Sequence, residues 1–452
     1  MVEVHEYIDR EMGRFRGELD EFLRIPTISA RSEYREEMGR GAEWLAEQMR
    51  SAGLETTMEP TGGFPIVLGE YRGAGADAPT VLIYGHYDVQ PAEPLEEWTS
   101  EPFEPTVRDG RLYARGAVDD KGQLFLHVKA IEAHMKTGGG LPVNLVVLAE
   151  GEEEVGSEHL MPFVSQHQDR LSCDYVVISD TTMVAPGVPT IGTSLRGIAY
   201  LELHVTGPKV DLHSGSYGGA VVNPATALAR IIASMHDEAW RATIPGFYDD
   251  VDPMEEYRAR LGDVPFDSAA FRADTGAEEV GEAGFTTPER LWIRPTVEVN
   301  GLLAGYTGEG AKTVLPSTAM AKISFRLVPD QEPGRIAELV ERHVKQVAPR
   351  GVRVEVRRLH GGRAWRATLG SELYEAAERA LRAAWGRDVV YAGEGGSIPI
   401  VPEFEEVLDA PVLLMGFGLP GENAHAPDEW ISEENIVKGV HAAAQLMHEL
   451  AS

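Results

Sequence analysis

Apolar runs and amphipathic segments alternate along most of the chain. The first 50 residues are expected to form helices, because apolar positions such as Ile8, Phe15 and Leu19 recur at roughly helical spacing. Four later runs are of the kind buried in parallel sheets: residues 80–85, 143–151, 174–180 and 410–418. Between the first two runs, apolar positions in residues 121–135 fall on one helix face. This alternation predicts an α/β fold, with a mixed, mostly parallel sheet flanked by helices.

A different pattern follows Thr190. Residues 199–207 and 319–329 alternate apolar and polar positions, as half-exposed antiparallel strands do. Helical patterns lie between and after them, at residues 223–237 and 335–349. These features predict a second domain of the α+β class.

The first pattern returns near the C-terminus with a helical segment at residues 371–386. The second domain is therefore an insertion. We predict a first domain made of residues 1–190 and 360–452, and an inserted domain made of residues 191–359. The acidic stretch from Tyr248 to Glu289 is poorly periodic and is interpreted as a long excursion within the insertion.

Composition and charge exclude several classes of function. The net charge of −31 argues against nucleic-acid binding, which needs basic surface. No apolar run is long enough to cross a membrane, and the start at Met1 lacks a secretory leader. Cys173 is the only cysteine, so an internal disulfide framework is impossible. We therefore expect a cytoplasmic protein.

Histidines and carboxylates follow each of the parallel-type strands. His86 and Asp88 come after the first run, three glutamates at 152–154 after the second, Asp180 ends the third, and His425 follows the fourth. In open α/β sheets, ligands bind outside the carboxyl ends of the strands. The loop carrying Asp119 and Asp120 precedes a predicted helix and could reach the same crevice.

Such a cluster suits metal binding. Crowded carboxylates repel one another, and a divalent cation removes that penalty, with histidine nitrogen and carboxylate oxygen as its usual ligands. Taken singly, each residue is more typical of a cap or a solvated loop, and the glutamates at 152–154 also suit an acid-rich helix start. The joint pattern favours a metal site, and two cations sharing a carboxylate fit the number of ligands better than one zinc.

At these residues the chain resembles a known family from about Phe22 to its C-terminus. It is similar to the dinuclear zinc metallopeptidases that include carnosinase-type dipeptidases, aminoacylase, acetylornithine deacetylase and glutamate carboxypeptidases. The dipeptidase branch is the most similar. The motifs that carry the resemblance are GHYDVQP, RLYARGAVDDKGQ, EGEEEVGS, VISD, DLHSGSYGG, GEGAKTVLP, FRLVPDQ and GEGGSIP.

The resemblance implies a zinc-exopeptidase-like fold with an inserted lid or dimerisation domain, and it assigns roles to the clustered residues. His86 and Asp180 would bind one metal ion, Glu154 and His425 the other, and Asp119 would bridge both.

Glu153 would be the general base and Asp88 would hold the second nitrogen of His86, whereas Glu152 would have no role. The order of these three glutamates rests on their spacing to Gly156, and a shift by one position would exchange the base for a bystander.

The resemblance also implies residues that contact substrate. His213 would stabilise the oxyanion in the active site of the partner subunit of a homodimer. Arg326 would bind a substrate carboxylate, and Thr313 and Ser397 would hydrogen-bond its backbone.

The expected activity is hydrolysis of dipeptides or short peptides that have a free C-terminal carboxylate. Two alternatives remain: a deacylase of N-acyl amino acids, and an inactive scaffold or binding protein of the same fold. The expected cofactors are two divalent metal ions, with Zn²⁺ as the family default and Mn²⁺ or Co²⁺ as other choices.

Overall fold

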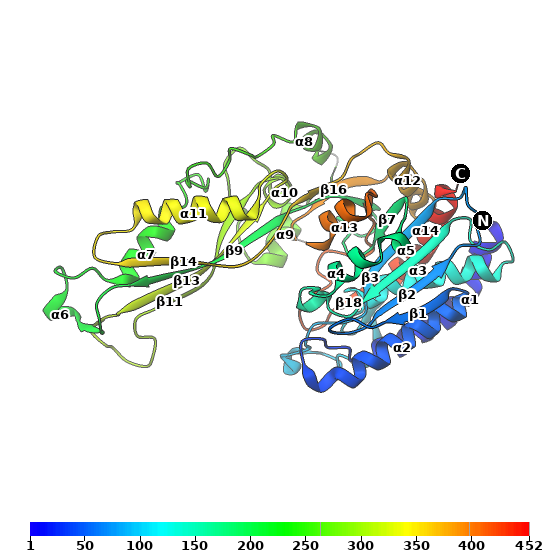
Figure 1. Cartoon of the computed structure of the whole chain (residues 1–452), viewed down its shortest axis with the longest axis horizontal. Helices are drawn as coiled ribbons and strands as arrows, with labels where there is room; N and C mark the ends of the chain where they lie inside the picture. Colours follow the sequence, from blue (N-terminus) through cyan, green and yellow to red (C-terminus); the bar gives the residue numbers. More distant parts are fainter. Residues whose placement is uncertain (263, 397, 452) are drawn as a thin grey trace.

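The structure is a computed structural model that describes residues 1–262, 264–396 and 398–451. It consists of a larger body that contains both chain ends and an elongated smaller body beside it (Figure 1). Each body has its own hydrophobic core. The larger core combines residues from Val4 to Leu195 with residues from Trp365 to Met447, whereas the smaller core runs from Ala199 to Val344. The boundaries near 190 and 360 stay a prediction.

A nine-stranded sheet is the frame of the larger body. Its strands are β1 (Glu55–Glu59), β2 (Ile66–Tyr71), β3 (Thr80–His86), β6 (Asn144–Glu150), β7 (Tyr175–Ile178), β8 (Thr190–Leu195), β15 (Trp365–Arg366), β16 (Val390–Glu394) and β17 (Val412–Leu414). The central strands β6, β3, β7 and β17 are parallel neighbours. Antiparallel strands extend both edges, with β2 beside β6 and β8 beside β17. The expected mixed α/β sheet is confirmed, and its parallel part is the centre.

Helices cover both faces of this sheet. One layer contains α1 (Val2–Leu23), α2 (Arg35–Ala52), α3 (Lys121–Lys136), α12 (Glu372–Trp385) and α14 (Glu433–Leu450). The other contains α4 (Leu160–Gln166), α5 (Gln168–Leu171) and α13 (Ile400–Leu408). Successive residues of β3 face opposite layers. Tyr84 packs against Phe404 of α13, and Gly85 faces Leu124 of α3.

A second, three-stranded sheet joins the end of the chain to its first half. It consists of β4 (Thr106–Arg108), β5 (Arg111–Tyr113) and β18 (Trp430–Ser432), with β18 antiparallel to β5. The residues before β18 therefore lie beside the loop that leads from β5 to α3. This pairing brings two distant parts of the chain to the same end of the large sheet.

The smaller body is a four-stranded antiparallel sheet with helices on one face (Figure 1). Its strands, in spatial order, are β11 (Thr296–Ala304), β13 (Thr318–Leu327), β9 (Gly197–Thr206) and β14 (Arg353–Gly362), and the helices are α7 (Pro224–Ala233) and α11 (Pro333–Val347). Alternate residues of β9 are buried, as the sequence pattern predicted. At the end far from the larger body lie β10 (Leu212–His213), β12 (Val314–Leu315) and α6 (Ser214–Tyr217).

The described part of the acidic stretch contains α8 (Glu255–Leu261) and α9 (Ser268–Thr275), and α10 (Thr287–Trp292) begins near its end. Local caps begin two of them. Asp267 accepts hydrogen bonds from the first turn of α9, and Thr286 and Glu289 form a capping box at α10. The Tyr257 hydroxyl donates to the carbonyl of Ala367 over 2.6 Å. This stretch therefore reaches back to the larger body.

The strands and helices that the hydrophobic pattern predicted are all present. The four apolar runs became β3, β6, β7 and β17, and the segment between the first two became α3. Among the described residues, no helix combines the length and the apolar character that crossing a membrane requires.

Candidate metal centre and active site

Histidines and carboxylates from separate strand ends meet beyond the parallel strands of the large sheet. His86 is the last residue of β3, Asp180 follows β7, Glu154 lies in the turn after β6, His425 lies in the loop after β17, and Asp119 precedes α3. They form two groups. Ligand atoms of His86, Asp119 and Asp180 lie within 4.8 Å of one another, and so do those of Asp119, Glu154 and His425. The two groups share Asp119.

His86 is fully buried and directs Nε2 at two carboxylates. The nitrogen lies 3.1 Å from Oδ1 of Asp119 and 3.8 Å from Oδ2 of Asp180. Nevertheless, Nε2 makes no hydrogen bond of good geometry with the described residues. A buried polar atom without such a bond is costly, and coordination of a cation would satisfy it. Imidazole nitrogen with carboxylate oxygens is a donor set that suits Zn²⁺, and this group therefore fits a metal ion.

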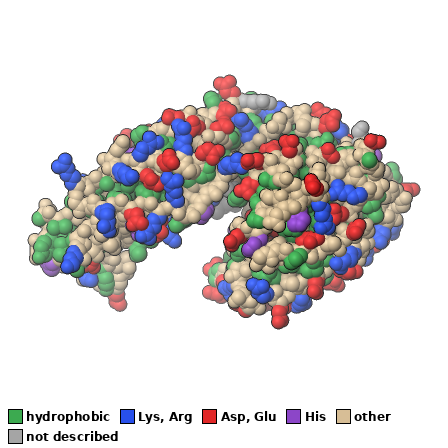
Figure 2. Space-filling view, viewed as in Figure 1, with side chains coloured by type: hydrophobic (Ala, Val, Ile, Leu, Met, Phe, Trp, Pro, Cys, Tyr) green, Lys and Arg blue, Asp and Glu red, His purple; other side chains and the backbone are tan. Residues whose placement is uncertain are grey.

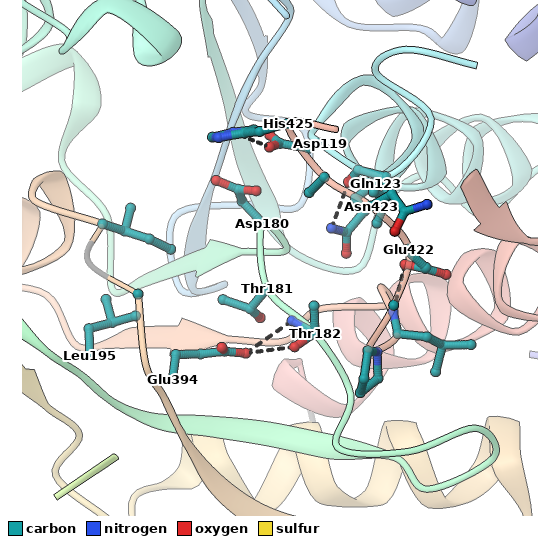
Figure 3. Close-up of a pocket in the computed structure, with 17 residues that line it drawn as sticks. Asp119, Gln123, Asp180, Thr181, Thr182, Leu195, Glu394, Glu422, Asn423 and His425 are labelled. Carbon is teal, nitrogen blue, oxygen red and sulfur yellow. Dashed lines mark hydrogen bonds and ion pairs between the residues drawn. The ribbon is translucent and has the colours of Figure 1, made fainter. Parts of the chain in front are cut away.

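Asp119 uses one oxygen for each group. Its Oδ2 lies 2.8 Å from Nε2 of His425, which is also 3.3 Å from Oε2 of Glu154. Figure 3 shows His425 and Asp119 facing each other beside Asp180. One carboxylate placed between two histidines is the arrangement that a bridging ligand of two cations requires.

The electrostatics of the cluster reflect its crowding. Burial, reinforced by Asp119, raises the pKa of Asp180 well above its usual value. Burial also raises the pKa of Asp120 to about 8 and that of Glu153 to about 7. A contact with Asp119 raises the pKa of His425 to about 10. Positive charge is therefore favourable throughout this site, which supports binding of cations.

Asp88 is buried between His86 and the glutamate turn. Nδ1 of His86 lies 3.1 Å from the main-chain oxygen of Asp88 and 3.4 Å from its carboxylate. The carboxylate accepts hydrogen bonds from the main-chain nitrogens of Glu153 and Glu154, over 3.3 and 3.1 Å. A proton on Nδ1 leaves Nε2 as the nitrogen that can bind a metal. Asp88 thus contacts the histidine mainly through its backbone, and its carboxylate holds the turn, which the sequence did not predict.

The three consecutive glutamates point to different partners. Oε2 of Glu152 lies 2.8 Å from Nδ1 of His159, away from the cluster. Glu154 belongs to the group with His425 and also accepts a hydrogen bond from Gln90 over 2.7 Å. Glu153 lies between them on the turn. The order predicted from the spacing is compatible with this geometry, and the role of Glu153 stays a prediction.

Glu429 is a buried residue that sequence reasoning missed. Its Oε1 accepts hydrogen bonds from the main-chain nitrogens of Val118 and Asp119, over 3.0 and 3.2 Å. Its Oε2 pairs with Arg115 over 2.8 Å, and this pair is buried on both sides. Glu429 therefore connects the loop of His425 to the loop of Asp119. The only sequence signal was indirect, since Arg115 lies inside the motif RLYARGAVDDKGQ.

Three of the four predicted substrate residues lie on the smaller body. His213 and Thr313 are exposed near α6, at the end farthest from the larger body (Figure 1). Arg326, on β13, lines a cavity of about 380 Å³ with Arg196 and Arg294. The structure thus does not bring His213 and Thr313 to the metal cluster of the same chain. Ser397 lies outside the described residues.

A cavity of about 390 Å³ opens beside the cluster. Asp119, Asp180 and His425 line it, with Thr182 and Glu394 farther from the cluster (Figure 3). On the face shown in Figure 2, the molecule is hollowed between the larger and smaller bodies. The geometry can therefore admit a small molecule to the two ligand groups.

Comparison with known proteins gives consistent matches over the whole chain. The model of peptidase family M20/M25/M40 matches residues 82–449. The Cys-Gly metallodipeptidase dug1 of Schizosaccharomyces pombe is 33% identical, over 99% of this chain and 98% of the relative. The human Beta-Ala-His dipeptidase is 30% identical, over 100% of this chain and 93% of the relative.

A solved structure shares the fold. The di-peptidase Dug1p from Saccharomyces cerevisiae superposes with a TM-score of 0.85 at 29% sequence identity. The match covers 100% of this chain and 98% of that one. The arrangement of a mixed sheet with an inserted domain is therefore shared along the full length.

Proposed function

Because the chain belongs to peptidase family M20/M25/M40, we propose that it is a metal-dependent dipeptidase that hydrolyses the amide bond of dipeptides with a free carboxylate. The family resemblance expected from the motifs is confirmed, and the similar proteins include Cys-Gly and Beta-Ala-His dipeptidases. The observation that carries the proposal is the pair of ligand groups that share Asp119.

Two divalent cations would be held by this chain's own side chains. His86 and Asp180 would hold one, Glu154 and His425 would hold the other, and Asp119, which belongs to both ligand groups, would be shared. Zn²⁺ is our first choice, and Mn²⁺ or Co²⁺ suit the same nitrogen and oxygen donors. When bound, the cations supply Lewis acidity that polarises the scissile carbonyl and makes water more acidic.

Glu153 acts as general base and then as general acid. It accepts the proton of the attacking water and passes it to the leaving amine. Burial raises its pKa to about 7, which suits both directions of transfer near neutral pH. Asp88 positions this residue through the main-chain nitrogen of Glu153 and positions His86 at the same time.

Substrate recognition requires the smaller body and a second copy of the chain. Arg326 binds the substrate carboxylate, and His213 and Thr313 reach the active site of the partner in a homodimer. The edge strand β11 supports this assembly, because Leu302 and Leu303 are 63% and 57% exposed on it. Burial of an exposed apolar edge strand against a second chain is favourable. Ser397 is proposed to hydrogen-bond the substrate backbone, as expected from its motif.

We also propose that the enzyme is cytoplasmic and acts on small peptides. Cys173 is the single cysteine, which suits a compartment in which thiols stay reduced. The net charge of −31 is unfavourable for nucleic acid as a partner.

The test is turnover by purified protein that is first stripped with a chelator and then reloaded with Zn²⁺, Mn²⁺ or Co²⁺. We expect no hydrolysis of Ala-Gly before reloading and full hydrolysis afterwards, with N-acetylalanine a much poorer substrate. Turnover that survives complete metal removal would overturn the proposal. A preference for N-acetylalanine would establish the deacylase instead.

A further inference from the structure

A second and larger cavity adjoins the cavity at the metal cluster. Its volume is about 730 Å³, within the range typical of ligand sites. The two cavities share Thr182, Glu394 and Pro420 as wall residues. Figure 3 shows Glu394 and Thr182 on the side of the first cavity away from His425. A molecule bound at the metal cluster can therefore extend past these residues into the second cavity.

The walls of this cavity are largely apolar and come from both bodies. The larger body contributes Met183 and Val184 from the segment after β7, and Ala392 from β16. The acidic stretch and the end of α10 just beyond it contribute the other wall: Phe266 before α9, Ala270 and Phe271 on α9, and Leu291 and Trp292 on α10. The stretch that was least periodic in the sequence thus builds part of an apolar cavity next to the proposed active site.

Two of these side chains expose apolar area in the present structure. Phe266 is 37% exposed and Leu291 is 36% exposed, and the ring of Phe266 lies 5.6 Å from that of Phe271. Covering exposed apolar area by an apolar group is favourable. Asp267 and Thr286 cap the starts of α9 and α10, the two helices that carry most of this wall. An apolar or aromatic occupant matches this cavity better than a polar one.

The charge at the border determines which end of a peptide lies there. Thr182 donates two hydrogen bonds to Oε1 of Glu394, from its main-chain nitrogen and its hydroxyl, both over 3.1 Å. Burial raises the pKa of Glu394, and a neighbouring ammonium group would favour its ionised form. The ionised carboxylate attracts that ammonium group and repels a substrate carboxylate. Arg326, the proposed partner of the substrate carboxylate, lines a different cavity. The N-terminal residue of the substrate is therefore the one whose side chain borders the apolar cavity.

We infer that the cavity between α9, α10 and the segment after β7 is a subsite for a large apolar or aromatic side chain on the N-terminal residue of the dipeptide. This inference rests on the proposed dipeptidase function and names its substrate class. It assigns Phe271, Trp292 and Leu291 a role in specificity. A small first residue such as alanine leaves the subsite unfilled.

The inference predicts a preference within matched substrates. The kcat/KM for Phe-Gly exceeds that for Ala-Gly by roughly 10- to 100-fold, since burying an aromatic side chain contributes about 1.5–3 kcal/mol. Ala270→Phe fills the cavity from α9 and reduces the ratio of the two values to near 1. Phe271→Ala weakens the wall and lowers the ratio by roughly 10-fold. Ala269→Phe is the matched control, because Ala269 is an exposed residue on the same helix outside the cavity.

Two arms separate the failure of this inference from the failure of the proposed function. The first arm measures turnover of Phe-Gly, Ala-Gly, Gly-Phe and Gly-Ala by the metal-loaded enzyme. An equal Phe-Gly to Ala-Gly ratio in the Ala270→Phe and Ala269→Phe variants would overturn the subsite. A change confined to Gly-Phe would overturn its assignment to the N-terminal residue.

The second arm measures binding of Phe-Gly and Ala-Gly by calorimetry, in metal-loaded chains that also carry Glu153→Gln. Tighter binding of Phe-Gly that Ala270→Phe abolishes and Ala269→Phe preserves would support the subsite, even if no dipeptide were cleaved. If Phe-Gly binds equally tightly to the Ala270→Phe and Ala269→Phe variants, the proposed subsite is wrong, whatever the turnover.

Discussion

The two bodies of the molecule hold their functional residues in opposite ways. In the larger body, His86, Asp88 and Glu429 are buried and held by contacts within the chain. In the smaller body, His213 and Thr313 are exposed at the tip, far from the metal cluster of their own chain. The residues of the proposed chemistry are thus held within one chain, whereas the proposed recognition by His213 and Thr313 would require a second chain.

The general base should give the largest effect of any single substitution in the larger body. Glu153→Gln keeps the size of the side chain but cannot accept the proton of water, so we expect kcat to fall by roughly 10²–10⁴-fold. Metal content, measured by elemental analysis, should stay unchanged. Glu152→Gln is the matched control one position away, because Glu152 pairs with His159, and its kcat should stay near that of the wild type.

A result in which Glu152→Gln loses turnover and Glu153→Gln keeps it would reverse the assignment of the two glutamates. Loss of metal from Glu153→Gln would make this residue a ligand instead of a base.

In the smaller body, His213 should act in the active site of the partner chain. His213→Ala removes one oxyanion donor, and we expect a fall in kcat of roughly 10²–10³-fold. Mixing this variant with Glu153→Gln under conditions of subunit exchange should restore activity. The mixed dimer then contains one site with both an intact base and a histidine from its partner.

Mixing that leaves activity at the level of the separate variants would contradict action between chains. So would wild-type turnover in a preparation shown to be monomeric by sedimentation.

The buried Arg115–Glu429 pair should be important for stability as well as for the position of Asp119. Glu429→Gln leaves a buried guanidinium without its charged partner, and we expect the free energy of unfolding to fall by about 3 kcal/mol. The control is Glu104→Gln, since Glu104 pairs with Arg24 at the surface, where solvent screens the pair and the expected loss is much smaller. Urea denaturation measures both, and equal losses would refute the role given to burial.

A histidine in each body makes the same contact with a serine, and pH distinguishes their environments. Nε2 of His127 lies 2.7 Å from the hydroxyl of Ser179, and burial lowers the pKa of His127 to about 4. In the unfolded chain the pKa of this histidine is near 6.5, so the unfolded chain binds a proton at a higher pH than the folded chain does. This difference lowers the free energy of unfolding by about 2 kcal/mol at a pH of about 5. When the pH is lowered from 7 to 5, the free energy of unfolding, measured by urea denaturation, should therefore fall less in His127→Gln than in the wild type.

The matched variant in the smaller body is His343→Gln, because His343 contacts Ser234 over 2.9 Å on the outer helix α11. Burial lowers the pKa of His343 as well, and we expect a smaller change than for His127→Gln. An equal or larger change in the pH dependence of unfolding for His343→Gln would contradict the expected difference between the two environments.

The contrast between the bodies also explains what could be predicted from the sequence. His86 and Asp180 were identifiable because each ends an apolar strand, and parallel strands bring their carboxyl ends together. Glu429 was missed because a buried loop carboxylate has no periodic signal. Its partners, the main-chain nitrogens of Val118 and Asp119, lie 311 and 310 residues away in the sequence.

The acidic stretch illustrates a second limit. Helices α9 and α10 are short, so hydrophobic periodicity is weak there, although the capping residues Asp267 and Thr286 mark their starts. The proposed place of His213 in a partner's active site would depend on a second chain, and within the sequence only the resemblance of its motif indicates it.

The central claim is that one carboxylate, Asp119, holds two cations together with two further residues each. The most direct measurement is the number of tightly bound Zn²⁺ ions per chain in the wild type, His86→Ala and Asp119→Ala after reloading and desalting. The account predicts two ions in the wild type, one in His86→Ala and neither held tightly in Asp119→Ala. A fully active wild type with a single ion, or an Asp119→Ala variant that retains both, would contradict it.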